Sequence, residues 1–237
     1  MGKNKKPNTG ASIVSKLHLK LAEVEPITKA QGDFFKNYDT GKCQLLMGYP
    51  GTGKTFLSMY KAFEELINGG TDLNQIVIVR SAVPTRDIGF LPGDINEKQQ
   101  VYELPYKKVC SELFGRDDAY EILVKHGIVR FMITSYVRGI TLDNCIIIMD
   151  EFQNCTSHEA DSVLTRLGKK SKALFCGDFM QTDFVKDKDK DVCKFVKVLE
   201  SMPNWFQTNE FGVDDIVRSG LVKAYIRAKY LVHKDGY

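Results

Sequence analysis

Short, continuously apolar runs recur along the chain and alternate with longer amphipathic stretches. Strands that are buried on both faces of a parallel sheet carry such runs, and amphipathic helices connect them. The expected strands are Cys43–Met47, Ile76–Val79, Ile128–Ile133, Cys145–Met149 and Ala173–Cys176, with Trp205–Phe211 as a weaker sixth. The pattern therefore predicts a three-layer αβα sandwich around a mainly parallel sheet.

Helices are expected between these runs, over Thr55–Asn68, Val101–Phe114, Asp117–Lys125, Ser157–Leu167, Lys190–Glu200 and Leu221–His233. Gly69 and Gly168 follow two of them and Pro203 follows a third, as expected at helix ends. The chain shows no internal repeat and no linker rich in Pro or Ser. We therefore expect one domain over residues 21–237, preceded by a basic, partly disordered arm over residues 1–20.

The net charge of +3 is not spread over the chain, because the first twenty residues contain five lysines and no acidic residue. This local excess disfavours a strongly cationic, DNA-coating protein. No apolar run is long enough to span a bilayer, and the N-terminus lacks the apolar segment of a signal peptide. We expect a cytoplasmic protein without a membrane partner, whose six cysteines, lacking any Cys-x-x-Cys spacing, are reduced thiols.

The residues that follow the first apolar run are Gly48-Tyr49-Pro50-Gly51-Thr52-Gly53-Lys54-Thr55, which match the pattern G-x-x-x-x-G-K-[ST]. The glycines let the backbone bend so that successive N–H groups point inward, and the N-terminus of the next helix adds positive potential. Such a loop binds a polyphosphate. Lys54 is expected to reach the β and γ phosphates of a nucleotide, and the Thr55 hydroxyl to ligate Mg²⁺.

A second element of the same site is expected where the apolar run Cys145–Met149 ends in two acids, Asp150 and Glu151. Asp150 is the expected partner of Mg²⁺ through water, since this ion keeps much of its hydration shell. Glu151 is then available as the general base for an attacking water. The acid pair favours a nucleoside-triphosphate hydrolase over a small-molecule kinase, and GTP is disfavoured because the guanine-reading pattern Asn-Lys-x-Asp is absent.

The motifs Asp150-Glu151-Phe152-Gln153 and Gly177-Asp178-Phe179-Met180-Gln181 make the chain resemble the first motor domain of superfamily-one helicases. It is most similar to the PhoH-like ATPases of bacteria and phages, with a RecA-like core. The resemblance runs from about Pro26 to about Val222, and further matches are Gly89–Asp94, Arg138–Leu142, Leu164–Gly168 and Asp215–Arg218. Two positions depart from the family pattern: Phe152 replaces a common alanine and Ser81 a common proline.

The resemblance implies roles for two glutamines. Gln31 resembles the glutamine of the helicase Q-motif, whose amide pairs with the adenine edge, and this favours ATP. Gln181 is expected to lie beside the γ-phosphate and to report hydrolysis to the nucleic-acid face.

An arginine is also implied, because a superfamily-one helicase places ATP between two motor domains and the second donates arginines to the γ-phosphate. We expect the stretch after Glu151 to complete one sheet without a second motor domain. We therefore expect the arginine from a neighbouring subunit of a closed ring, with a hexamer as the form that the resemblance implies. Arg218 and Arg166, both within matched motifs, are the candidates.

Contacts with nucleic acid are expected from Arg80, Arg86 and Phe90, which follow the second strand and offer charge and a stacking ring. The resulting hypothesis is an ATP-hydrolysing, helicase- or translocase-type motor that acts on single-stranded RNA or DNA. The alternative is an ATP-dependent switch or chaperone that binds a protein partner without nucleic acid.

Overall fold

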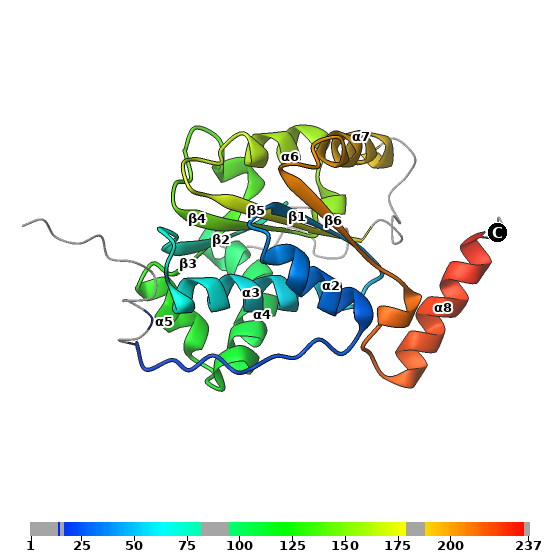
Figure 1. Ribbon diagram of the computed structural model, residues 1–237, viewed down its shortest axis with the longest axis horizontal. Helices are drawn as coiled ribbons and strands as arrows, with labels where there is room; N and C mark the ends of the chain where they lie inside the picture. Colours follow the sequence, from blue (N-terminus) through cyan, green and yellow to red (C-terminus); the bar gives the residue numbers. More distant parts are fainter. Residues whose placement is uncertain (1–13, 15–16, 82–94, 179–187, 235–237) are drawn as a thin grey trace, which may run out of the picture.

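The computed structural model describes Val14 and residues 17–81, 95–178 and 188–234 (Figure 1). Its described part contains a six-stranded sheet in the order β3-β2-β4-β5-β1-β6, and every neighbouring pair of strands is parallel. The strands are β1 (Cys43–Gly48), β2 (Gln75–Arg80), β3 (Val129–Ile133), β4 (Cys145–Asp150), β5 (Lys172–Gly177) and β6 (Phe206–Phe211). The six predicted strands are confirmed.

Helices cover both faces of the sheet, so the predicted three layers are confirmed. One face carries α2 (Lys29–Tyr38), α3 (Lys54–Asn68), α4 (Ile95–Phe114) and α5 (Ala119–Lys125), and the other carries α6 (Ser157–Leu164) and α7 (Lys188–Glu200) (Figure 1). In the buried strand β4, Ile146 and Ile148 pack toward the first set, and Ile147 and Met149 toward the second. A strand that alternates between two apolar layers must be apolar throughout, which explains the continuous runs in the sequence.

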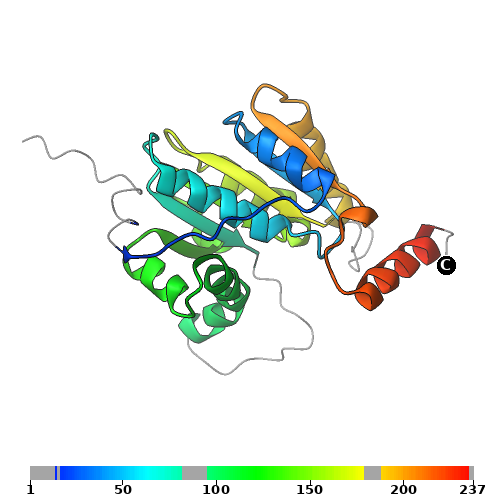
Figure 2. The same ribbon diagram turned by 60° about the horizontal axis from the view of Figure 1, so that its bottom comes forward.

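The last helix, α8 (Gly220–Lys234), lies apart from these layers beyond the edge strand β6 (Figures 1 and 2). Its apolar side chains Leu221 and Tyr225 are 82% and 66% exposed. Three short 3₁₀ segments complete the described structure: η2 (Thr134–Tyr136), η3 (Phe152–Asn154) and η4 (Val213–Asp215).

Two helices differ from the prediction for identifiable reasons. The helix α6 starts at Ser157 as expected, with Thr156 as its N-cap in a capping box, but it ends at Leu164. The next residues turn, and Leu167 forms an isolated parallel bridge with Leu142. The helix α4 begins at Ile95, before the predicted start at Val101, because the polar residues 96–100 give no apolar periodicity, and it continues through Pro105 as predicted.

The helix α2 was not predicted, although Thr28 carries the side-chain oxygen of an N-cap and Phe34 and Tyr38 follow at helical spacing. The extended segment before α2 runs along the same helical layer (Figures 1 and 2). Val14 and Leu19, which fall within the expected arm, are buried in the hydrophobic core on this face of the sheet. The other residues of the arm, except 17–20, lie outside the described part.

All six cysteines lie in the described part of the chain, and each is a free thiol there. Four of them are buried, Cys43 is half-buried and Cys193 is exposed. Among the helices that the structure describes, none combines the length and the apolar character needed to cross a membrane.

Candidate nucleotide site

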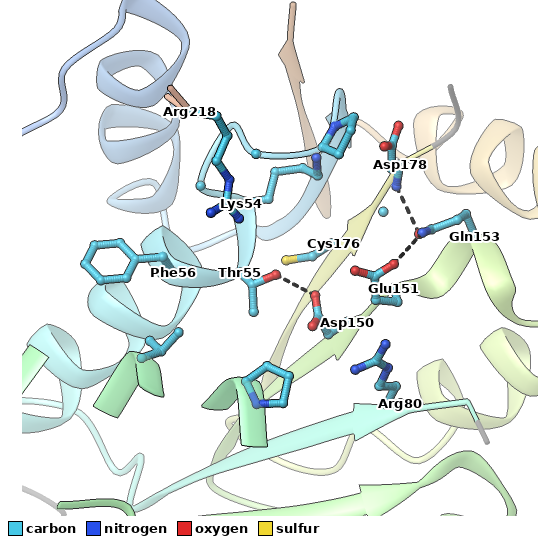
Figure 3. Close-up of a pocket in the computed structure, with 16 residues that line it drawn as sticks. Lys54, Thr55, Phe56, Arg80, Asp150, Glu151, Gln153, Cys176, Asp178 and Arg218 are labelled. Atoms are coloured by element: carbon cyan, nitrogen blue, oxygen red, sulfur yellow. Dashed lines mark hydrogen bonds between the residues drawn. The ribbon is translucent and has the colours of Figure 1, made fainter. Parts of the chain in front are cut away.

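The site lies at the edge of the sheet where the parallel strands end. Arg80, Asp150 and Cys176 are paired across the ends of β2, β4 and β5, and β1 ends beside Gly177. A cavity of about 400 Å³ opens at this edge (Figure 3). Its lining residues are Pro50, Gly51, Gly53, Lys54, Thr55, Phe56, Arg80, Pro105, Val109, Asp150, Glu151, Gln153, Cys176, Gly177, Asp178 and Arg218.

The loop between β1 and α3 requires glycine at two positions in particular. Gly48 and Gly51 have φ angles of 145° and 75°, in the region that side chains rarely adopt. A Cβ atom on Gly48 would lie 2.0 Å from the Phe211 carbonyl oxygen, and one on Gly51 would lie 2.6 Å from Cγ of Arg218. The segment after β6 is also tied to the loop, since the Val217 N–H donates to the Gly51 carbonyl at 2.9 Å.

The side chain of Lys54 folds back over this loop. Its ammonium donates to the carbonyls of Gly48 and Tyr49 at 3.1 and 2.7 Å and to the Thr52 hydroxyl at 3.3 Å. Burial lowers the pKa of Lys54, and the charge of Asp178 opposes this effect. The ammonium thus lies in the cavity on acceptors that phosphate oxygens can replace.

Each carboxylate oxygen of Asp150 accepts a hydrogen bond from a hydroxyl. The Thr55 hydroxyl donates to Oδ1 at 2.7 Å, and the Tyr106 hydroxyl donates to Oδ2 at 2.9 Å. Burial raises the pKa of Asp150, and the charge of Glu151 raises it further. Mg²⁺ prefers hard oxygen ligands. The Thr55 hydroxyl and the Asp150 carboxylate, both predicted to bind Mg²⁺, therefore provide adjacent oxygen ligands that fit this ion.

Glu151 follows Asp150 in an unusual backbone conformation. Its φ and ψ angles are 53° and 38°, a left-handed region that costs a non-glycine residue free energy and that occurs often at functional sites. The Gln153 amide donates to Oε2 of Glu151 at 2.6 Å and accepts from the Asp178 N–H at 2.9 Å (Figure 3). One glutamine thus links the ends of β4 and β5 and holds the predicted general base at the cavity.

Of the four arginines with assigned roles, three are described, and two of these line the cavity. Arg218, which was expected to serve a neighbouring subunit, lines the cavity of its own chain (Figure 3). Arg80, which was expected to contact nucleic acid, lines the same cavity, and its Cζ lies 5.8 Å from the centre of the Tyr102 ring. Arg166 lies near the end of the sheet at which the strands begin. Its carbonyl accepts a hydrogen bond from the N–H of Leu142, shortly before β4 begins.

Gln31 contacts the loop instead of facing the cavity. Its amide donates to the Thr52 carbonyl at 3.1 Å and accepts from the Ile27 N–H at 2.9 Å, and the side chain is buried. The donor of the amide therefore joins α2 to the loop and its acceptor joins α2 to the segment before it, so pairing with adenine would require both bonds to be exchanged. The remaining predicted residues Gln181, Arg86 and Phe90 lie outside the described part of the chain.

Two residues that hold the acids of the site, Gln153 and Tyr106, were not predicted to do so. Gln153 could have been found, because it stands two positions after the predicted general base in a motif already singled out. Tyr106 carries no local signal, since it meets Asp150 from 44 positions away in the sequence. The family departure at Phe152 serves packing: this side chain is fully buried, with its ring 5.8 Å from that of Phe175.

An all-parallel sheet whose first strand enters a glycine-rich phosphate loop, with an acid pair at a neighbouring strand end, defines a P-loop NTPase with a RecA-like core. The family model described as PhoH-like protein matches residues 23–230. The chain belongs to this family.

Relatives and solved structures agree with this assignment. The PhoH-like protein of Bacillus subtilis (strain 168) is 36% identical over 183 residues, which cover 77% of this chain and 56% of that protein. Protein PhoH of Escherichia coli (strain K12) is 32% identical over 208 residues, covering 84% and 56%. The chain thus spans little more than half the length of these curated relatives. The large terminase of a thermophilic bacteriophage shares the fold, with a TM-score of 0.50, 12% identity and coverage of 86% of this chain and 50% of that one.

Proposed function

We propose that this chain hydrolyses ATP and uses the reaction to move along or remodel single-stranded RNA or DNA. The observation that carries the first part is the 2.7 Å contact between Thr55 and Asp150. It joins the end of the phosphate loop to a strand-end carboxylate 95 positions away in the sequence. A structural glycine turn has no need of such a carboxylate beside it.

The mechanism follows from the residues around the cavity. The N–H groups of the loop and the ammonium of Lys54 hold the phosphates. Glu151, held by Gln153, accepts a proton from the attacking water. The water oxygen bonds to the γ-phosphorus, the bond from that phosphorus to the β–γ bridging oxygen breaks, and ADP and phosphate result. Thr55 and Asp150 would hold Mg²⁺, which supplies neutralisation of charge on the β and γ phosphates.

The arginine that the transition state requires is supplied most simply by Arg218 of the same chain. Its side chain lies against Gly51 and lines the cavity. The ring was predicted because the site needed an arginine from a neighbouring subunit. Arg218 of the same chain lies at the cavity, so this reason is weaker. A hexameric ring remains a proposal, which native mass measurements with and without ATP test.

Support for a nucleic-acid substrate comes from the edge of the sheet beside the cavity. Tyr136, in the short segment that follows β3, is 47% exposed and presents an aromatic ring where the strands end. Exposed rings on which bases stack are typical of single-strand binding. Because Arg80 lines the nucleotide cavity, we assign it to the nucleotide and keep Arg86 and Phe90 as candidates for the polymer.

The decisive experiment is the ATPase rate with Mg²⁺, measured with poly-U, with oligo-dT and without either, at one fixed salt concentration because phosphate contacts depend on salt. We expect hydrolysis in all three samples and stimulation by at least one polymer. Hydrolysis with no response to either polymer would favour the alternative, a switch or chaperone for a protein partner. A chain that hydrolyses no ATP would contradict the proposal altogether.

A further inference from the structure

We propose that Tyr106 is a positioning residue that orients the carboxylate of Asp150 for Mg²⁺. The inference rests on the proposed function, because it concerns the same nucleotide site. It assigns a role to α4, an element that contributes nothing to either of the motifs by which the site was recognised.

The geometry at Asp150 is that of a carboxylate fixed on both sides. A carboxylate is planar, so fixing one oxygen determines where the other lies. The Tyr106 hydroxyl donates to Oδ2 at 2.9 Å, on the side of α4, and Oδ1 is thereby directed to the Thr55 hydroxyl at 2.7 Å. The two hydroxyls therefore select the orientation in which Asp150 and Thr55 present oxygens side by side.

Tyr106 is itself rigidly placed. Its side chain is fully buried, and the ring lies 5.7 Å from that of Phe131 on β3. A tyrosine ring in a packed core has few alternative rotamers, so its hydroxyl is a fixed donor. The same helix lines the cavity through Pro105 and Val109. A shift of α4 would therefore move the hydroxyl that orients Asp150.

Hydrogen bonds of this kind are common around bound metal ions. Carboxylates that hold a metal are usually oriented by donors from residues that do not touch the ion, and loss of such a donor costs about 10- to 100-fold in metal affinity or activity. The alternative is that Tyr106 only satisfies a buried carboxylate. The two interpretations differ in what happens to the Mg²⁺ dependence when the hydroxyl alone is removed.

The test is direct binding of a fluorescent ATP analogue to the full chain, in a Mg²⁺ titration and in EDTA, for the wild type and for Tyr106→Phe. We expect the Mg²⁺ concentration that gives half-maximal tightening to rise about tenfold in the variant. Binding in EDTA should be unchanged, because the loop and Lys54 are intact.

Tyr38→Phe is the matched control. Tyr38 is also buried, and its hydroxyl also donates to a carboxylate, that of Glu65 at 2.6 Å, but neither residue lines the cavity. This variant should leave the Mg²⁺ titration as in the wild type. An unchanged titration in Tyr106→Phe, or an equal loss of affinity in EDTA, would overturn the positioning role while leaving the proposed function intact. A wild type that does not bind the analogue under any condition would overturn both.

Discussion

The cavity has two unlike walls. The loop wall consists of Pro50, Gly51, Gly53, Lys54 and Thr55, with Arg218 lying against Gly51, and the acid wall consists of Asp150, Glu151, Gln153 and Asp178. The loop wall is cationic and the acid wall is rich in carboxylates, so the first is suited to bind phosphates and the second to hold a metal ion and activate water.

The two walls also differ in how they are held. The ammonium of Lys54 donates its hydrogen bonds to residues no more than six positions away. Asp150 and Gln153 take theirs from Thr55, Tyr106 and Asp178, at separations of 95, 44 and 25 positions. The ammonium that binds phosphate is therefore held within the loop itself, whereas the acids are held by the packing of distant elements. Variants of the two walls should separate nucleotide affinity from turnover.

The largest effect is expected at Arg218. This residue lies on the loop wall, so a loss of turnover there would not fit an assignment of binding to one wall and reactivity to the other. If its guanidinium neutralises the transition state, Arg218→Ala lowers turnover by about 10³-fold or more at saturating ATP. The measurement is a single-turnover rate.

Mixing distinguishes an arginine of the same chain from one of a neighbour. Equal amounts of Arg218→Ala and Glu151→Gln should remain as slow as either alone at saturating ATP, because each chain then lacks one part of its own site. Recovered activity in the mixture would show that Arg218 serves the next subunit, as the ring prediction holds.

Glu151→Gln should lower turnover by about 10²- to 10⁴-fold, since the amide cannot accept the proton of the attacking water. Affinity for ATP should stay within about twofold of the wild type, because the loop wall is unchanged. Stopped-flow binding and a phosphate-release assay measure the two quantities on one preparation. Near-normal phosphate release from this variant would remove Glu151 as the general base.

Lys54→Ala should lower the affinity for ATP. Loss of a charged hydrogen bond to phosphate costs about 1.5–3 kcal/mol, which is roughly a 10- to 100-fold loss of ATP affinity. Isothermal titration with a slowly hydrolysed ATP analogue measures it. Unchanged affinity would mean that Lys54 stays on its loop carbonyls when the nucleotide binds. The loop wall would then not bind the phosphates through this ammonium.

The smallest effect is expected for Gln153→Ala. The substitution removes the amide that holds Glu151 but leaves the carboxylate in place, so turnover should fall about tenfold through misplacement, with affinity unchanged. Gln153→Glu is the sharper variant, because it keeps the side-chain length and cannot donate to Glu151 when ionised. Equal turnover in Gln153→Glu and the wild type would show that this hydrogen bond does not position the base.

Much of the fold was predictable because its signals are contiguous. Continuous apolar runs such as Cys145–Met149 identified each strand, and glycine or proline marked several helix ends. The helix α2 was missed despite the cap at Thr28, since the segment was interpreted only as a nucleotide-contacting motif. The start of α4 at Ile95 was missed because residues 96–100 are all polar, so no apolar periodicity indicates a helix before Val101.

The sequence by itself determined the phosphate loop and the strand that ends in two acids. Backbone bending at Gly48 and Gly51 and the apolar character of a buried strand are properties of neighbouring residues, so no distant contact is needed to recognise them. Only the tertiary structure decided that Arg218 faces its own loop, that Gln31 holds that loop and that Tyr106 meets Asp150. Those contacts depend on the direction in which α2, α4 and the segment after β6 cross the sheet, and the packing of whole layers sets that direction.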